Sequence, residues 1–153
     1  MTRLAPALAT ALAPMLAPGF AALMLGAAPA LADEVWTSNL GPVMWETDQG
    51  ETAVLRLDVA GTGALVRMFV PGLAADMMGG RGAYTGVWIA SDADAECVVE
   101  MVDPVSARKS RYWGTFTITF VNEGFPSDWA GVYGNCLETP AAPIQAHAQV
   151  GGQ

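Results

Sequence analysis

The side chains that could do chemistry in this chain are few, and they match no common catalytic arrangement. The single histidine, His147, falls close to the C-terminus, in a stretch rich in Pro, Ala, Gln and Gly. Histidine is the usual general base, so this position argues against a Ser-His-Asp or Cys-His site. No glycine-rich loop precedes a predicted helix, and no Cys/His spacing matches a zinc site. We therefore expect a protein that is not an enzyme and that uses no cofactor.

Carboxylates supply the one catalytic chemistry that remains open. A pair of acidic side chains is sufficient for glycosidic hydrolysis when one acts as acid and the other as base or nucleophile. The available candidates are Glu100, Asp103, Glu123 and Asp128. The ordinary interpretation of such residues is solubilising charge on strand faces and loops. A carboxylate-based hydrolase is therefore the second alternative function.

Three carboxylates alternate in the segment Ser91-Asp-Ala-Asp-Ala-Glu96 and partly match a calcium-binding loop. The candidate ligands are Asp92, Asp94 and Glu96. The segment lacks the glycine at the sixth position and the bidentate glutamate at the twelfth position of such a loop. We expect an acidic turn between strands here, and no metal site elsewhere.

The N-terminal segment predicts export. Residues 1–32 combine one basic side chain, Arg3, with an apolar stretch that ends in Pro29-Ala-Leu-Ala32. Small residues at positions 30 and 32 suit cleavage after Ala32 by a signal peptidase. An uncleaved anchor is the alternative, but prolines and a glycine interrupt the apolar run. We expect a periplasmic or secreted protein that has no membrane segment after cleavage.

Export affects the expected state of the two cysteines and the net charge of the exported chain. In an oxidising compartment an even pair, Cys97 and Cys136, predicts a disulfide. Residues 33–153 contain six basic and fifteen acidic side chains, a net charge of −9. This charge excludes nucleic acid as a partner, and it favours a cationic protein partner such as a hydrolase.

The apolar residues after position 32 alternate with period two, and turn residues recur every eight to twelve positions. This pattern is typical of an all-β domain, which we predict over residues 33–138 as a small, mostly antiparallel barrel or sandwich of about eight strands. The predicted strands are 34–38, 43–47, 52–59, 64–70, 83–89, 97–103, 111–121 and 132–137. Residues 139–153 show no clear strand pattern, and we predict a disordered tail there.

Two local features make the β prediction more specific. Placing Asp58 opposite Arg67 across a hairpin avoids two arginines facing each other, so we expect that register. Gly86 and Gly114 fall inside predicted strands beside bulky rings. Such glycines mark bends or bulges covered by neighbouring aromatic side chains, and they favour a barrel.

Two long loops, Pro71 to Gly82 and Asn122 to Gly131, are the candidate recognition face. Aromatic, thioether and arginine side chains commonly anchor interfaces. The candidate partner-binding residues are Met77, Met78, Arg81, Phe125 and Trp129. For Phe125 and Trp129 the alternative is a small core formed by the loop itself.

The function we expect is therefore a non-catalytic binding module that recognises a protein partner through these loops. The first alternative is a carrier of a small apolar ligand in a barrel cavity. The predicted inward residues, among them Leu55, Leu57, Met68, Phe116 and Ile118, are bulky enough to fill a small barrel. Their bulk favours the partner module over the carrier.

Overall fold

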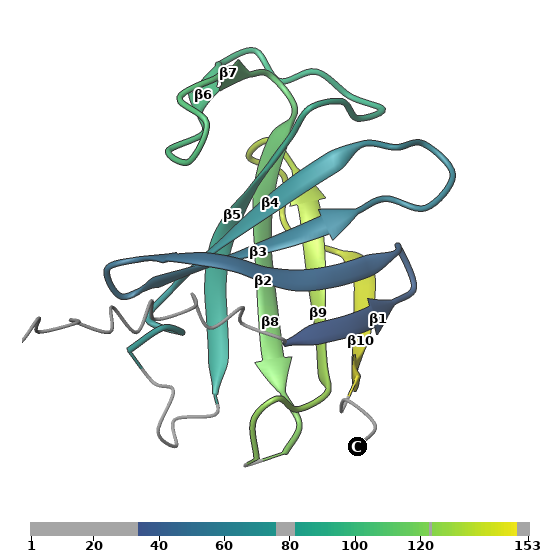
Figure 1. Cartoon of the computed structure of the whole chain (residues 1–153). Helices are drawn as coiled ribbons and strands as arrows, with labels where there is room; N and C mark the ends of the chain where they lie inside the picture. Colours follow the sequence, from purple (N-terminus) through teal and green to yellow (C-terminus); the bar gives the residue numbers. More distant parts are fainter. Residues whose placement is uncertain (1–33, 76–81, 123, 150–153) are drawn as a thin grey trace, which may run out of the picture. The chain divides into compact units, whose positions relative to one another are not determined.

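A computed structural model describes residues 34–75, 82–122 and 124–149, and in this part of the chain the fold is all-β. Eight strands close into an antiparallel barrel in which each strand pairs with its neighbours along the chain, and the last strand pairs with the first (Figure 1). The predicted fold class is confirmed, and it is a barrel rather than a sandwich. The described ranges contain no helix that is long and apolar enough to span a membrane.

The barrel strands are β1 (Val35–Ser38), β2 (Pro42–Gln49), β3 (Thr52–Asp58), β4 (Leu65–Pro71), β5 (Ala83–Ala90), β8 (Trp113–Phe120), β9 (Trp129–Asn135) and β10 (Ala142–Gln149). Two short strands, β6 (Met101–Val102) and β7 (Lys109–Ser110), pair with each other outside the barrel. They belong to the long connection between β5 and β8, residues 91–112, which we call the β6–β7 lobe.

The prediction of a disordered tail over residues 139–153 is wrong. Ala142–Gln149 forms β10, which closes the barrel between β9 and β1. Two of its three inward positions carry small side chains because they face large ones: Ala148 lies opposite Trp36, and Ala146 lies opposite Trp129, whereas the third is Ile144. Alanine and glutamine have low strand propensity, so this strand depends on tertiary packing rather than on local preference.

The predicted barrel strand over residues 97–103 is also wrong. Only Met101–Val102 is extended there, and it pairs with β7 in the lobe. Val98 is 92% exposed and Val99 is 61% exposed, so this run of apolar residues does not face the barrel core. The predicted number of eight barrel strands holds because β10 takes the place of this segment.

The lobe covers a second, smaller core on the outside of the barrel wall. Val54, Phe69 and Ile89 point outward from three neighbouring strands and pack with Trp113 and Cys97. Outward apolar positions on β3, β4 and β5 explain the short apolar runs within these strands, Ala53-Val-Leu55, Met68-Phe-Val70 and Val87-Trp-Ile-Ala90, since both faces are covered there.

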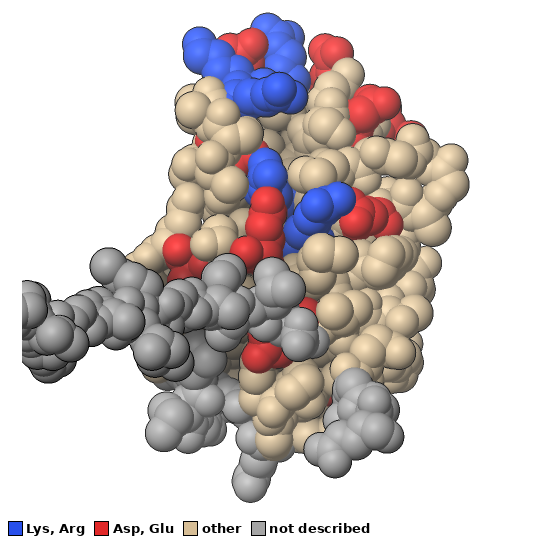
Figure 2. Space-filling view, in the orientation of Figure 1, with Lys and Arg blue, Asp and Glu red and all other residues tan. Residues whose placement is uncertain are grey.

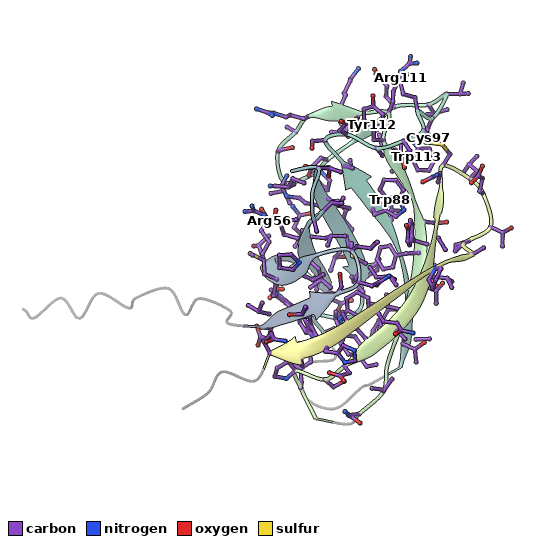
Figure 3. All side chains as sticks on the ribbon, turned by 90° about the vertical axis from the view of Figure 1, so that its right-hand side faces the viewer. Arg56, Trp88, Cys97, Arg111, Tyr112 and Trp113 are labelled. Atoms are coloured by element: carbon purple, nitrogen blue, oxygen red, sulfur yellow. A yellow bond between two sulfur atoms is a disulfide. The ribbon has the colours of Figure 1, made fainter. Side chains whose placement is uncertain are left out.

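The disulfide between Cys97 and Cys136 is confirmed, and it ties the start of the lobe to the end of β9. Figure 3 shows Cys97 beside Trp113, whose indole N–H donates to the Val99 carbonyl at 2.7 Å. Cys97 is 3% exposed, and its sulfur lies within the second, smaller core, which we call the outer core. A buried disulfide is consistent with an oxidising, exported environment.

The expected register of the β3–β4 hairpin is wrong: Arg56 lies opposite Arg67, and Asp58 lies opposite Leu65. Carboxylates compensate for the two facing cations. Arg56 pairs with Asp58 at 3.0 Å on its own strand. Arg67 binds both oxygens of Glu46, at 2.7 and 2.8 Å, and also Asp103 of the lobe at 2.6 Å. A β-bulge between Trp45 and Thr47 inserts Glu46 at this position.

Candidate functional site

The main cavity of the described chain is a pocket of about 430 Å³ at the barrel end that carries the β3–β4 loop, the start of the lobe and the β9–β10 turn. We call it the barrel pocket. Its walls are formed by buried apolar side chains from five strands: Leu57, Met68, Trp88, Ala90, Phe116 and Ile144. The more exposed lining residues form its mouth and are of mixed polarity: Thr62, Asp92, Asp94, Tyr133 and Asn135 are polar, and Leu40, Val59, Ala64, Val66 and Ala93 are apolar.

Two glycine–aromatic pairs on β5 and β8 help to keep the pocket open. Gly86 lies directly opposite Phe116, and Trp88 lies directly opposite Gly114. The ring of each aromatic residue occupies the place that a Cβ on the opposite glycine would take. The rings therefore lie against bare backbone of the neighbouring strand, as in aromatic rescue of glycine.

The prediction that aromatic rings cover Gly86 and Gly114 is confirmed. Neither glycine marks a bulge, because the β5–β8 register is regular; the bulge lies on β2. Trp88 is fixed further by its indole N–H, which donates to the Gly134 carbonyl at 3.0 Å (Figure 3 shows the position of Trp88).

We expect Gly114→Ala to lower the free energy of unfolding by at least about 2 kcal/mol, because the new methyl group has no space. A Cβ at position 114 would lie 2.7 Å from Trp88 Nε1 and would also meet the Gly134 carbonyl oxygen. Gly82→Ala is the matched control, since a Cβ there has nothing within 4 Å. Urea unfolding of the two variants checks the prediction, and equal stability would show that Trp88 does not need this glycine.

Aromatic side chains fill the opposite end of the barrel. Phe125 packs edge-to-face against Trp36 and Trp45, with ring centroids 6.0 and 5.7 Å apart, and it also meets Phe120. Trp36 donates its indole N–H to the Ser127 carbonyl at 2.9 Å. This end is therefore closed by the folded-back 121–128 loop, which matches the small-core alternative for that loop.

Of the recognition face expected on the two long loops, the structure describes only Phe125 and Trp129. Trp129 is 1% exposed and lies inside the barrel at the start of β9, so its indole offers no surface to a partner. Phe125 is half-buried against the barrel core. The other three candidates, Met77, Met78 and Arg81, lie outside the described residues.

The acidic segment 91–96 contributes two residues to the lining of the pocket. Asp92 and Asp94 line the mouth, whereas Glu96 accepts a hydrogen bond from the Tyr112 hydroxyl at 3.1 Å. Within the described ranges no three His, Cys, Asp or Glu side chains are grouped so that they could hold a metal ion.

The candidate catalytic carboxylates are distributed over different local contacts. Glu100 lies 3.7 Å from Lys109 and 3.9 Å from Arg111 in the lobe, and Asp103 binds Arg67. Asp128 lies beyond β8 and pairs with His147 of β10 at 2.9 Å, and the hydrogen bond from His147 lowers the pKa of Asp128. Glu123 lies outside the described residues. Each of the three described carboxylates therefore contacts a different set of basic side chains.

Sequence reasoning missed the barrel pocket, because it counted the volume of the inward side chains without their directions. Trp88 and Phe116 are large, but they lie against glycines rather than across the lumen. The spacing Gly86-Val-Trp88 on one strand and Gly114-Thr-Phe116 on the other is the signal that could have indicated this arrangement.

Comparison with protein-family models, with curated proteins and with solved structures finds no match to this chain.

Proposed function

We propose that this protein is a carrier or binding protein for a small apolar ligand held in the barrel pocket. The observation that carries the proposal is the pocket itself: it has a volume of about 430 Å³, apolar walls and a few polar groups at its mouth. Ligand sites in proteins are typically clefts of roughly 300–1,000 Å³ with mostly apolar walls and a few polar groups that set orientation.

The construction of the barrel supports a ligand site at one end only. The end that carries Phe125 and Trp36 is packed with rings, so it provides a floor, while the mouth lies at the other end. The disulfide and the outer core brace the wall that contains Trp88, since Cys97, Ile89 and Trp113 pack on its outer face. A rigid wall suits binding because little conformational entropy is lost when a ligand enters.

The experiment is a titration with N-phenyl-1-naphthylamine, a neutral apolar dye whose fluorescence rises in an apolar environment. We expect saturable binding at one site with a Kd of about 10 µM, a value in the range expected for a ligand of this size. Ala90→Phe places a ring at a buried position of the pocket wall and should weaken binding at least about tenfold.

Ala83→Phe is the matched control, because Ala83 is on the same strand but is exposed and lies outside the pocket lining. It should leave the Kd unchanged. Thermal melting of both variants shows whether each is folded. Equal binding by the wild type and a folded Ala90→Phe variant would overturn the assignment of the pocket as the ligand site.

Recognition of a protein partner stays a prediction, and it would have to use surfaces other than Trp129. Export to the periplasm or beyond is part of the proposal as well. It is supported by the signal-peptide pattern of residues 1–32, which lie outside the described residues, and by the disulfide.

A further inference from the structure

The charge at the mouth of the barrel pocket is negative. Asp92 and Asp94 are exposed at the mouth, and the lining residues include no Lys, Arg or His. Neither carboxylate takes part in a salt bridge among the described residues. Their charge is therefore available to whatever enters the pocket.

The described Lys and Arg side chains lie outside the pocket lining. Those with carboxylate partners lie on the outer barrel wall or in the lobe: Arg56, Arg67, Lys109 and Arg111. Figure 2 shows basic side chains gathered at the tip of the β6–β7 lobe, where residues 108, 109 and 111 follow one another closely in the chain. The negative charge of the carboxylates at the pocket mouth is therefore not neutralised by an internal ion pair.

The acidic segment is held in place over the mouth. Ser91 donates its N–H to the Leu65 carbonyl at 3.0 Å, and its hydroxyl accepts from the Leu65 N–H at 3.2 Å. Ala93 packs against the barrel core between the two aspartates, and Cys97 fixes the far end of the segment by the disulfide. The short segment that carries the two carboxylates is therefore anchored at both of its ends.

The pKa of Tyr112, next to the acidic segment, is affected mainly by Glu96 and least by Asp92. The hydrogen bond to Glu96 and the charge of Glu96 raise the pKa of Tyr112, and the charge of Asp92 adds to the effect. A negative potential at a mouth above low-dielectric walls attracts cations and repels anions.

We propose that the barrel pocket selects ligands that combine an apolar body with a cationic head group, such as an amine. The apolar walls formed by Leu57, Met68 and Phe116 take the body, and Asp92 and Asp94 take the head group. An anionic amphiphile of the same length is disfavoured, because its head group would face two carboxylates with no cation to bind it. This inference rests on the proposed carrier function.

The test uses three ligands with the same ten-carbon chain: decylammonium, decanol and decanoate. Each is titrated at low salt against the purified protein loaded with the neutral dye, and the concentration for half-displacement is measured. We expect decylammonium to displace the dye at a concentration at least about tenfold lower than decanoate, with decanol between them. Added salt should reduce the difference.

The double variant Asp92→Asn, Asp94→Asn should bring the ratio between decylammonium and decanoate below about threefold while the Kd of the neutral dye stays the same. The control variant Glu34→Gln, Glu51→Gln removes the same charge from residues at the opposite end of the barrel. It should keep the tenfold preference.

The outcomes separate this inference from the carrier function. Dye binding without a preference for decylammonium overturns the inference and leaves the carrier function intact. A preference lost equally in both double variants also overturns it, since overall charge would then explain the effect. Failure of the dye and of all three ligands to bind overturns the carrier function itself.

Discussion

Replacing both Cys97 and Cys136 by Ser is expected to lower the free energy of unfolding by about 4 kcal/mol. The disulfide closes a loop with a sequence separation of 39 residues, and the chain-entropy treatment gives a cost of this size for opening it. The loss should be larger than for an isolated surface bridge, because the same bond holds the lobe over Trp113 and the outer core. Urea unfolding of the variant and the oxidised wild type measures the difference.

Reduction provides the internal control for this prediction. Wild-type protein unfolded in dithiothreitol should match the double variant in stability, since both lack the bond. A difference below about 1 kcal/mol between oxidised and reduced protein would contradict the structural role given to the disulfide.

Replacing Arg67 by Met is expected to lower the free energy of unfolding by about 3–5 kcal/mol at neutral pH. The Arg67 side chain is 15% exposed and binds two carboxylates, those of Glu46 and Asp103, which are also largely covered. Removing the cation leaves two buried negative charges without their partner, which is the costly way to break such a cluster. Arg56→Met is the matched control, because Arg56 lies directly opposite on β3 but is 38% exposed; its loss should cost about 0–1 kcal/mol.

The pH dependence of this difference follows from Asp103. Burial raises the pKa of Asp103, but hydrogen bonds from Ser106, the Val105 N–H and Arg67 outweigh burial and hold the pKa below its usual value. The stabilisation by Asp103 is therefore complete above about pH 4, the usual range of an unfolded Asp, and it is lost as the pH falls through the lowered pKa. In Arg67→Met, protonation of Asp103 removes a negative charge that no longer has its cation, so the stability gap from wild type should narrow at low pH. A gap that is small at pH 7 or widens in acid would contradict the role of the cluster.

Strong alternation in the sequence was sufficient to predict most of the barrel. Thr115 to Phe120 places Phe116, Ile118 and Phe120 on one face, and all three are buried in the barrel. β10 is not predictable from the sequence because two of its three inward residues, Ala146 and Ala148, are small. The reason for their size, the indoles of Trp36 and Trp129 on the flanking strands, exists only after the chain has closed.

The register of Arg56 and Arg67 could not be predicted from the hairpin alone. The groups that compensate Arg67 come from a bulge on β2 and from the lobe, 21 and 36 residues away in the chain. Charge pairing between the two strands alone therefore favours the wrong register. The repulsion between the two facing arginines is instead offset by carboxylates, which for Arg67 come from outside the hairpin.

The candidate site, like the hairpin register, is only partly predictable from the sequence. The sequence predicts that Asp92 and Asp94 belong to an acidic turn. Their position at the pocket mouth, however, depends on the hydrogen bond between Ser91 and Leu65. Conversely, Trp129 carried the sequence signal of a loop anchor, but it starts β9 and points into the core. Aromatic residues next to a strand boundary can serve either role, and packing decides between them.

The most direct test of the account is to map the position of a bound ligand by heteronuclear NMR of labelled protein saturated with decanol. We predict chemical-shift changes and ligand contacts at Leu57, Met68, Trp88 and Ile144, with the indole N–H signals of Trp36 and Trp129 unchanged. No contact with these wall residues, or contacts confined to the exposed Val98 and Val99 of the lobe, would show that the barrel pocket does not hold an apolar ligand.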